Sequence, residues 1–501
     1  MSEKTMRETK NGTVEGIEQG SVLAWLGIPF AKPPVGELRF RRAQPVDDWE
    51  GVRPCREFAP GPMQFAGGSM GKMMKSEMPH SEDCLYLNVW APKEAEGAPV
   101  FIYLYGGANH VGETADPGYR LDSFARDGVV AVSIAYRLGP LGFYDFSPFS
   151  DRFDSNCAVS DVIEGLRWIQ ANIARFGGDP GNVTLCGESA GGSMVYCALA
   201  SPAAKGLFHK AIAMSGLAGN ATTRRGQSYN NGIFLEELGL DENSVDQLAG
   251  MEYEKLLQGA AKMFETSDSL YPGIFQTGAV VGDDLIPEPV WDALEHGSAK
   301  DVKCIFGTCE NEGALFTMMK MVPLSWDAVE RMFEFNGLSG KTVEAKKLYS
   351  GLKGKGLFAR LAHDRMFWTD AVKCALAQSR NNPHTYMYRF DFATILQKVM
   401  GLGASHGSDV GPALDTWEGA LAMFNKLTPK KKLQRMHEVV HGSFVAFACT
   451  GIPSAPSAPG WPAFEEGRRA TFVFDQRCSV VENQRLEAYD FWKGTTPHLY
   501  Q

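Results

Sequence analysis

The motif Gly-x-Ser-x-Gly, which can present a serine as a nucleophile, occurs three times in this chain of 501 residues. The three copies surround Ser69, Ser189 and Ser405. Only the copy at Ser189 follows a run of strand formers, residues 182–186, and precedes a helix-compatible run, residues 190–200. A strand, a sharp turn and a helix expose a serine hydroxyl to a base and to backbone N–H groups. We therefore identify Ser189 as the candidate nucleophile; an ordinary Gly/Ser loop is the alternative that its flanks disfavour.

A serine nucleophile needs a histidine as base and a carboxylate that orients this histidine. Where the serine lies in a strand–turn–helix elbow, the chain order is serine, then acid, then histidine. Glu310 and Glu312 both follow the apolar run 302–306, and the residues alone make them equal candidates for the acid. His406 is the candidate base because glycines flank its loop. Five further histidines follow both glutamates, and a lone histidine is more often structural: His363, His384, His437, His441 and His498.

The negative charge that develops on a substrate oxygen needs backbone N–H donors. One donor is expected from the residue after the serine, Ala190, and the others from a glycine-rich loop after an early strand. The apolar run 100–104, followed by Tyr105, Gly106, Gly107 and Ala108, fits because its small residues let a substrate approach the backbone. A tight turn with no catalytic role is the alternative interpretation.

The elements that must position these residues appear as apolar runs with strand propensity. Runs that are apolar throughout indicate a large, mostly parallel sheet covered by helices on both faces, an α/β fold. Apolar residues between Val159 and Ile173 recur at helical spacing and Gly177 follows as a stop, so a strand–helix–strand crossover leads into the elbow. Prolines and glycines in residues 27–40 predict an edge hairpin and a rigid loop. The predicted strands are 85–90, 100–104, 129–135, 183–186, 211–214, 302–306, 386–390 and 471–474.

Length alone allows two to four domains, although large α/β enzymes often form one. We predict a single domain over residues 1–501, with helical insertions at about 220–275 and 323–380 that cover the carboxyl edge of the sheet. In these two segments the apolar residues recur at helical intervals. The insertions are therefore expected to form a cap over the active site.

Composition excludes several classes of function. The formal charge is −10 and the only basic run is 430–432, which disfavours a nucleic-acid surface and is interpreted as a solvated helix face. The N-terminus lacks an apolar signal core and the apolar run 129–135 is too short to span a bilayer, so we expect a soluble, cytoplasmic protein without a membrane partner. Ten scattered cysteines predict free thiols, and no metal or cofactor is expected.

Together these segments resemble the type-B carboxylesterase (carboxylesterase/cholinesterase-like) family of α/β-hydrolases over nearly the whole chain. The resemblance rests on residues 27–40, Ser-Glu-Asp-Cys-Leu-Tyr-Leu-Asn at 81–88, residues 136–143, Phe-Gly-Gly-Asp-Pro at 176–180, and the elbow at 187–191. It implies the α/β-hydrolase fold and a serine carboxylesterase that cleaves small carboxylic esters through an acyl-enzyme on the elbow serine. Amide, carbamate or lactone hydrolysis by the same triad, and a non-catalytic binding homologue, are the alternatives. Monomer and homodimer both stay open.

The same resemblance assigns roles to individual residues. It implies Ser189 as nucleophile, His406 as base, and Glu312 as acid because this glutamate directly precedes the glycine of the family motif. It also implies that three backbone N–H groups donate hydrogen bonds to the oxyanion, those of Gly107, Ala108 and Ala190. Tyr105 stands where many family members have a histidine before the glycines.

Two departures from the family pattern bear on the substrate. In exported relatives the cysteine at the position of Cys84 pairs with another cysteine, but the corresponding turn here reads Gly-Pro-Met-Gln at 61–64. The resemblance therefore implies an unpaired Cys84. The same loop lacks the tryptophan on which cholinesterases stack a cationic substrate, so a choline ester is disfavoured.

Apolar residues in the loops nearest these motifs predict a substrate pocket whose walls can adapt to the ligand. For each of these residues, packing in the protein core is the alternative. Glu188, beside the nucleophile, is expected to organise water, to favour positive charge, or to serve as a structural acceptor. Ser215 and Asp409 are expected to support the triad or the fold. The predicted pocket residues are Phe65, Met70, Met73, Phe316, Met318, Met319, Met400 and Leu402.

Overall fold

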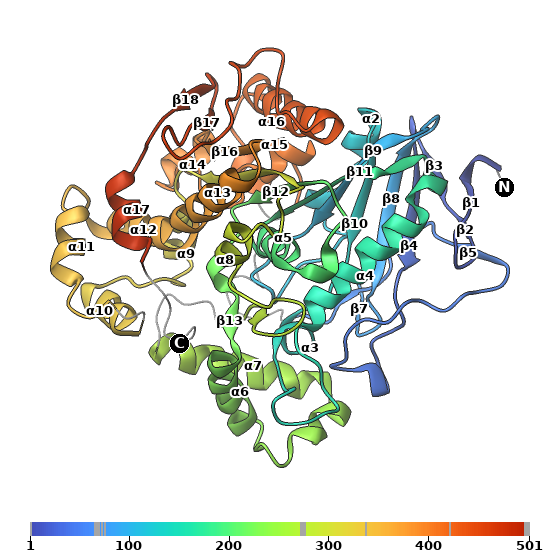
Figure 1. Cartoon of the computed structure of the whole chain (residues 1–501), viewed down its shortest axis with the longest axis horizontal. Helices are drawn as coiled ribbons and strands as arrows, with labels where there is room; N and C mark the ends of the chain where they lie inside the picture. Colours follow the sequence, from blue (N-terminus) through green and yellow to red (C-terminus); the bar gives the residue numbers. More distant parts are fainter. Residues whose placement is uncertain are drawn as a thin grey trace.

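A sheet of 11 strands runs through the centre of the molecule (Figure 1). The structure is a computed structural model that describes residues 3–64, 71, 74, 77–270, 277–335, 338–419 and 422–494. Neighbouring strands from β10 to β17 pair in parallel, whereas β18 at one edge and β8, β4 and β3 at the other pair antiparallel. In spatial order the strands are β18 (Ser479–Val481), β17 (Thr471–Phe474), β16 (Thr385–Phe390), β15 (Lys303–Cys309), β12 (Lys210–Met214), β11 (Gly178–Glu188), β9 (Ala98–Leu104), β10 (Val130–Ile134), β8 (Tyr86–Pro92), β4 (Val22–Pro29) and β3 (Ile17–Gln19).

Helices cover both faces of this sheet, which explains why its central strands are apolar throughout. Side chains alternate between the faces along a strand. Phe101 of β9 stacks on Phe124 of helix α2 (Asp122–Arg126) with ring centroids 3.9 Å apart. Ile134 of β10, which the register places on the opposite face, fills the space beside Gly165 of helix α4 (Cys157–Asn172). Helix α4 packs in one layer with α5 (Ala190–Ala200), α8 (Val290–Glu295) and α13 (Thr369–Asn381). On the other side α2 contacts α16 (Lys430–Thr450) through Phe124 and His441.

The helices of the described residues vary from short turns to the 21-residue α16. They are α2 (Asp122–Arg126), α3 (Gly139–Phe143), α4 (Cys157–Asn172), α5 (Ala190–Ala200), α6 (Arg224–Glu237), α7 (Tyr253–Leu270), α8 (Val290–Glu295), α9 (Gly313–Met318), α10 (Trp326–Phe335), α11 (Thr342–Leu348), α12 (Gly354–Ala362), α13 (Thr369–Asn381), α14 (Ile395–Val399), α15 (Val410–Leu414), α16 (Lys430–Thr450) and α17 (Leu486–Trp492). Shorter 3-10 or π segments are η1 (Glu3–Thr5), η2 (Gly36–Leu38), η3 (Pro117–Tyr119), η4 (Ile173–Phe176), η5 (Pro202–Ala204), η6 (Ala218–Asn220), η7 (Val245–Gly250), η8 (His363–Trp368) and η9 (Ala422–Asn425).

The local predictions agree with these elements. Each predicted strand overlaps an observed strand, and the predicted helix before the elbow is α4 with η4, ended by Gly177 at a φ of 85°. The edge hairpin predicted in residues 27–40 is wrong in place: the observed hairpin β3–β4 spans residues 17–29, and residues 30–40 form a loop that contains η2. The sequence did not reveal the short strands β1 (Met6–Glu8), β2 (Thr13–Glu15), β5 (Val52–Pro54), β6 (Gly61–Pro62), β7 (His80–Ser81), β13 (Thr222–Thr223) and β14 (Val280–Val281), which form small separate sheets.

Helices occupy both segments predicted to be insertions. Helices α6 and α7 pack together in the first segment, and α10 to α13 follow one another in the second. Around α10 to α12 a small hydrophobic cluster forms, which includes Phe333, Tyr349 and Trp492, separate from the main core. The division of the chain into one domain with two insertions stays a prediction.

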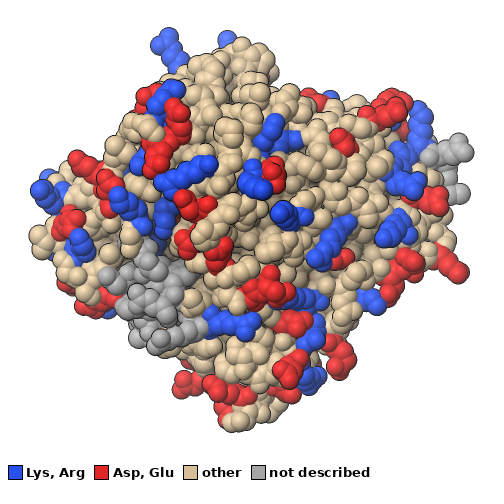
Figure 2. Space-filling view, in the orientation of Figure 1, with Lys and Arg blue, Asp and Glu red and all other residues tan. Residues whose placement is uncertain are grey.

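The surface and the cysteines follow from the composition. Acidic and basic side chains are interspersed over the face shown in Figure 2, and residues 430–432 lie exposed in the first turn of α16. All ten cysteines are free, as predicted, and Cys84 is buried. Among the helices of the described residues, none is long and apolar enough to cross a membrane.

Candidate active site

Ser189 occupies the sharp turn between β11 and α5, the context that distinguished it from the other motif copies. Its backbone has a φ of 58° and a ψ of −119°, a conformation that residues with a side chain rarely adopt. The flanking glycines permit this turn. A Cβ atom on Gly187 would lie 2.4 Å from the carbonyl oxygen of Gly191, and one on Gly191 would lie 2.1 Å from that of Leu104. Both positions therefore require glycine for strand and helix to close around the serine.

The three residues predicted to act as nucleophile, base and acid meet at the carboxyl edge of the sheet. Glu312 follows β15 and precedes α9, and His406 lies in the loop between α14 and α15. His406 Nε2 lies 2.8 Å from Ser189 Oγ, and His406 Nδ1 lies 2.6 Å from Glu312 Oε2. All three side chains are buried. A continuous hydrogen-bonded chain therefore joins the serine hydroxyl to a buried carboxylate.

The environments of the two rival glutamates differ sharply. Glu312 is fully buried, and its Oε1 accepts hydrogen bonds from the Ser215 hydroxyl and the Cys309 N–H, each at 2.6 Å. Glu310 turns away and pairs with the guanidinium of Arg360. Only Glu312 is thus held against the imidazole by fixed donors. Ser215 was expected to support either the triad or the fold, and its hydroxyl contacts the candidate acid Glu312 directly.

Two carboxylates act on the imidazole of His406. Glu188 Oε1 lies 3.3 Å from His406 Nε2, on the side of the ring that also faces Ser189. Burial disfavours the imidazolium, but Glu188 and Glu312 outweigh it and raise the pKa of His406 to about 9. Burial likewise raises the pKa of Glu188 to about 8. The aromatic rings of Phe316 and Phe367 pack on the imidazole with centroids 4.9 and 5.0 Å away.

Asp409 has a different position from Glu188. Its carboxylate is fully buried and accepts a 2.5 Å hydrogen bond from the hydroxyl of Tyr388. Burial raises the pKa of Asp409 to about 6. Asp409 therefore ties the end of the loop that carries His406 to Tyr388 of β16.

The glycine-rich loop after β9 brings further backbone groups to this edge. Gly107 and Ala108 have φ values of 125° and 54°, and Ala190 is the first residue of α5. The N–H groups of these three residues have no hydrogen-bond partner among the described residues. Tyr105 stacks on Tyr136, and each hydroxyl donates to the other residue's carbonyl oxygen at 2.8 and 2.6 Å. This reciprocal pair fixes the start of the loop.

Comparison with known proteins places this arrangement in a family. The model of the carboxylesterase family matches residues 3–492. The chain belongs to the carboxylesterase family. It is 33% identical to a para-nitrobenzyl esterase of Bacillus subtilis over 485 residues, 96% of each chain, and 31% identical to a phenmedipham hydrolase of Pseudarthrobacter oxydans over 96% of this chain and 97% of that one. The solved structure of a thermophilic PNB esterase matches 98% of this chain and 100% of its own, with a TM-score of 0.89 and 30% identity.

These matches confirm three predictions about this carboxylesterase: the family, the α/β-hydrolase fold, and a carboxylic-ester hydrolase as the class of enzyme. They do not test the roles of single residues.

An open cavity leads to Ser189 in this carboxylesterase. Its wall is largely apolar and aromatic, and it includes Gly107 of the predicted oxyanion loop. The described residues that line it include three acids but neither lysine nor arginine. The acids and the main aromatic residues are Asp116, Glu188, Glu418, Tyr119, Phe392, Trp417 and Phe424.

The residues predicted to line the pocket are placed in several ways. Glu188 lines the cavity, Phe316 packs on the ring of His406, and Met319 packs in a cluster with Phe316. Leu402 is buried against Phe424, behind the cavity wall. Met318 and Met400 are 42% and 45% exposed, outside the described cavity lining. Phe65, Met70 and Met73 lie outside the described residues.

Sequence reasoning missed the aromatic residues of the cavity. Tyr119, Trp417 and Phe424 carry no motif and come from η3, from the loop after α15 and from η9. The one signal that could have found them was their place in loops near the predicted oxyanion loop and the predicted base.

Proposed function

We propose that the chain is a serine carboxylesterase that hydrolyses small carboxylic esters through an acyl-enzyme on Ser189. In the first step His406 Nε2 takes the hydroxyl proton while Ser189 Oγ attacks the ester carbonyl carbon. The resulting imidazolium donates this proton to the leaving alcohol, and the C–O bond of the ester breaks. Water, activated by the same imidazole, then attacks the acyl-enzyme and releases the acid.

The observation that carries this proposal is the hydrogen-bonded chain from Ser189 through His406 to Glu312. Glu312 stabilises the imidazolium and holds the ring so that Nε2 faces the serine. We assign the oxyanion to the N–H groups of Gly107, Ala108 and Ala190, because these donors have no other described partner at the same edge of the sheet.

The cavity suggests which esters fit. An apolar and aromatic wall favours acyl or alcohol groups without charge. Its acids, with no lysine or arginine among the described lining residues, disfavour an anionic substrate. Neutral aryl or alkyl esters are therefore the proposed substrate class, and among charged esters a positive charge should be tolerated better than a negative one. A cytoplasmic location and the monomeric or dimeric state stay predictions.

Replacement of Ser189 by alanine tests the proposal. Turnover of a p-nitrophenyl ester should fall by several orders of magnitude, on the order of 10³-fold or more, while circular dichroism stays unchanged. A fluorophosphonate should label the wild-type protein once, at Ser189 and not at Ser405, as peptide mass spectrometry can show. Near-normal activity in the variant would refute the nucleophile.

The alternatives have distinct outcomes. Amide or lactone hydrolysis by the same triad would appear in a screen that sets aryl, short-chain and long-chain esters beside an anilide and a lactone. A non-catalytic homologue would fail to react with the fluorophosphonate. The intact hydrogen-bonded chain favours the hydrolase.

A further inference from the structure

The loop that carries two of the proposed oxyanion donors is held in a strained backbone conformation. Ala108 and Asn109 are consecutive residues with positive φ, 54° and 65°. Alanine is strained in this region and persists there only where its surroundings fix it, whereas asparagine adopts it more readily. Contacts from other parts of the chain must therefore hold the loop.

Thr277 contacts this loop twice. Its carbonyl oxygen accepts a hydrogen bond from Asn109 Nδ2 at 2.8 Å, and its hydroxyl lies 2.7 Å from His110 Nε2. Thr277 and Asn109 are 1% and 2% exposed, so water cannot replace these contacts easily. Burial lowers the pKa of His110 to about 3, so the ring stays neutral and its contact with Thr277 does not change near neutral pH.

Side chains from other parts of the chain hold the backbone of residues 277–280 by hydrogen bonds. Asn220 Nδ2 donates to the Thr277 carbonyl oxygen at 2.8 Å, and Gln227 Nε2 donates to that of Gly278 at 3.1 Å. The side-chain amide of Asn156 pairs with both the N–H and the carbonyl oxygen of Val280, at 2.7 and 2.8 Å. The segment therefore behaves as a fixed support.

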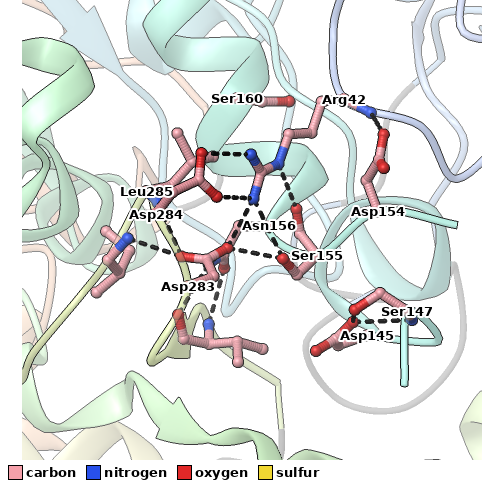
Figure 3. A network of polar contacts seen from close by, with 12 residues as sticks. Arg42, Asp145, Ser147, Asp154, Ser155, Asn156, Ser160, Asp283, Asp284 and Leu285 are labelled. Atoms are coloured by element: carbon pink, nitrogen blue, oxygen red, sulfur yellow. Dashed lines mark hydrogen bonds and ion pairs between the residues drawn. The ribbon is translucent and has the colours of Figure 1, made fainter. Parts of the chain in front are cut away.

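A buried ionic cluster closes this support, as Figure 3 shows. Asp283 accepts hydrogen bonds from Arg42, Ser155 and Asn156 at 2.9, 2.7 and 2.9 Å. Its other oxygen accepts from the backbone N–H groups of Leu285 and Ile286. Asp283 thus ties the far end of the segment to the start of α4 and to the N-terminal part of the chain.

We propose that Asn109 and Thr277 are positioning residues that hold the N–H groups of Gly107 and Ala108 in the geometry of the transition state. The inference rests on the proposed function of the loop. Asn109 follows Ala108 directly, so a rotation at Asn109 would turn the donor peptide groups away from the oxyanion. A misplacement of about 1 Å can reduce turnover on the order of 100-fold. The two residues should therefore act on kcat.

Asn220 supplies a matched control. Its amide donates to the same carbonyl oxygen, at the same 2.8 Å, but it lies in η6 and not in the oxyanion loop. Asn109→Ala and Asn220→Ala each remove one hydrogen bond to one acceptor, and in Asn220→Ala the segment after Thr277 keeps its hydrogen bonds with Gln227 and Asn156. For a neutral aryl ester we expect kcat to fall about 10-fold to 100-fold in Asn109→Ala, with KM within about threefold, and to stay within about threefold of wild type in Asn220→Ala.

Binding of a trifluoromethyl ketone reports on the oxyanion directly. Ser189 Oγ adds to its carbonyl carbon, the hydroxyl proton passes to His406, and the carbonyl oxygen becomes the oxyanion that the loop must hold. Affinity for this ketone should fall in Asn109→Ala by the same factor as kcat, and affinity for the reaction's carboxylate product should change little. Equal losses in the two alanine variants, or an unchanged kcat in Asn109→Ala, would overturn the inference.

A second pair of variants tests the His110 contact and guards against misfolding of Asn109→Ala. Thr277→Val keeps the shape but removes the hydroxyl, and Thr277→Ser restores it. We expect a several-fold loss of kcat in the valine variant and recovery in the serine variant; equal kcat in both would contradict the role of this contact. Wild-type protein that neither cleaves the ester nor reacts with fluorophosphonate would instead refute the proposed function.

Discussion

Replacement of Glu188 by glutamine should move the acidic limb of the pH–activity profile to lower pH. His406 must be neutral to accept the serine proton, so kcat/KM rises as the free enzyme loses the proton from His406. Glu188 is one of the two carboxylates that raise the pKa of His406. Glutamine keeps the size of the side chain and removes its charge. The neutral imidazole should therefore form at a lower pH in the variant.

The size of the shift follows from the geometry. Glu188 Oε1 lies 3.3 Å from His406 Nε2. At this distance and an effective dielectric constant of about 20, a full charge stabilises the imidazolium by about 5 kcal/mol, or about 4 pH units. This is a ceiling, because burial raises the pKa of Glu188 itself and leaves its carboxylate partly protonated while His406 titrates. We expect a downward shift of about 1–2 pH units.

The assay is kcat/KM for a neutral aryl ester, because a substrate without an ionisable group adds no titration of its own. Glu310→Gln is the matched control, since it removes a carboxylate that pairs with Arg360 and leaves the imidazole of His406 untouched. Its acidic limb should coincide with that of the wild-type protein. A limb in Glu188→Gln that stays in place or moves to higher pH would refute the reasoning.

Further predictions concern the acid, the elbow and the substrate. Glu312→Gln should lower kcat/KM about 10³-fold to 10⁴-fold and Glu310→Gln less than about threefold; the reverse order in the same ester assay would assign the acid to Glu310. Gly191→Ala should destabilise the fold by about 1–3 kcal/mol in urea, because its Cβ would lie 2.1 Å from a backbone oxygen, whereas Gly351→Ala meets nothing within 4 Å and should not. Of two matched aryl esters, one with a quaternary ammonium and one with a carboxylate on the acyl chain, the cationic ester should have a kcat/KM about 10-fold higher, and equal values would exclude a role for the cavity acids Asp116, Glu188 and Glu418.

The parts of the fold that the sequence predicted are those that local patterns determine. Apolar runs predicted the central strands because both faces of the sheet are covered, and the glycines of the elbow were informative because a Cβ at either position would clash. The choice between Glu310 and Glu312 was different. It depends on contacts with Ser215, His406 and Arg360, which are 97, 94 and 50 positions away. The residue types near Glu310 and Glu312 do not reveal such distant contacts. Only the family resemblance therefore distinguished Glu312 from Glu310 as the acid.

The pocket shows where proximity along the chain fails as a guide. Proximity to His406 along the chain predicts Met400 as a pocket residue. Met400 follows the five-residue helix α14, and the side chains of this segment point in different directions. Gln397 of this helix lines the cavity, whereas Ile395 and Met400 point outward, at 39% and 45% exposure. One turn of helix therefore separates a lining residue from a surface residue. A pattern of apolar residues without a periodicity of its own cannot tell the two apart.

In the loop after β9, which carries the proposed oxyanion donors Gly107 and Ala108, an unfavourable backbone conformation is itself informative. Alanine at positive φ runs against backbone preference, although asparagine tolerates it better, and a sequence does not reveal that Ala108 and Asn109 adopt it. Their support, Thr277, lies 168 positions from Asn109 and carries no motif. Local conflicts that persist in a folded protein concentrate at functional sites, because surrounding contacts must stabilise them. On the proposed function, the positive φ at residues 108 and 109 and the two contacts from Thr277 have one physical explanation: this loop is fixed for a charge that exists only in the transition state.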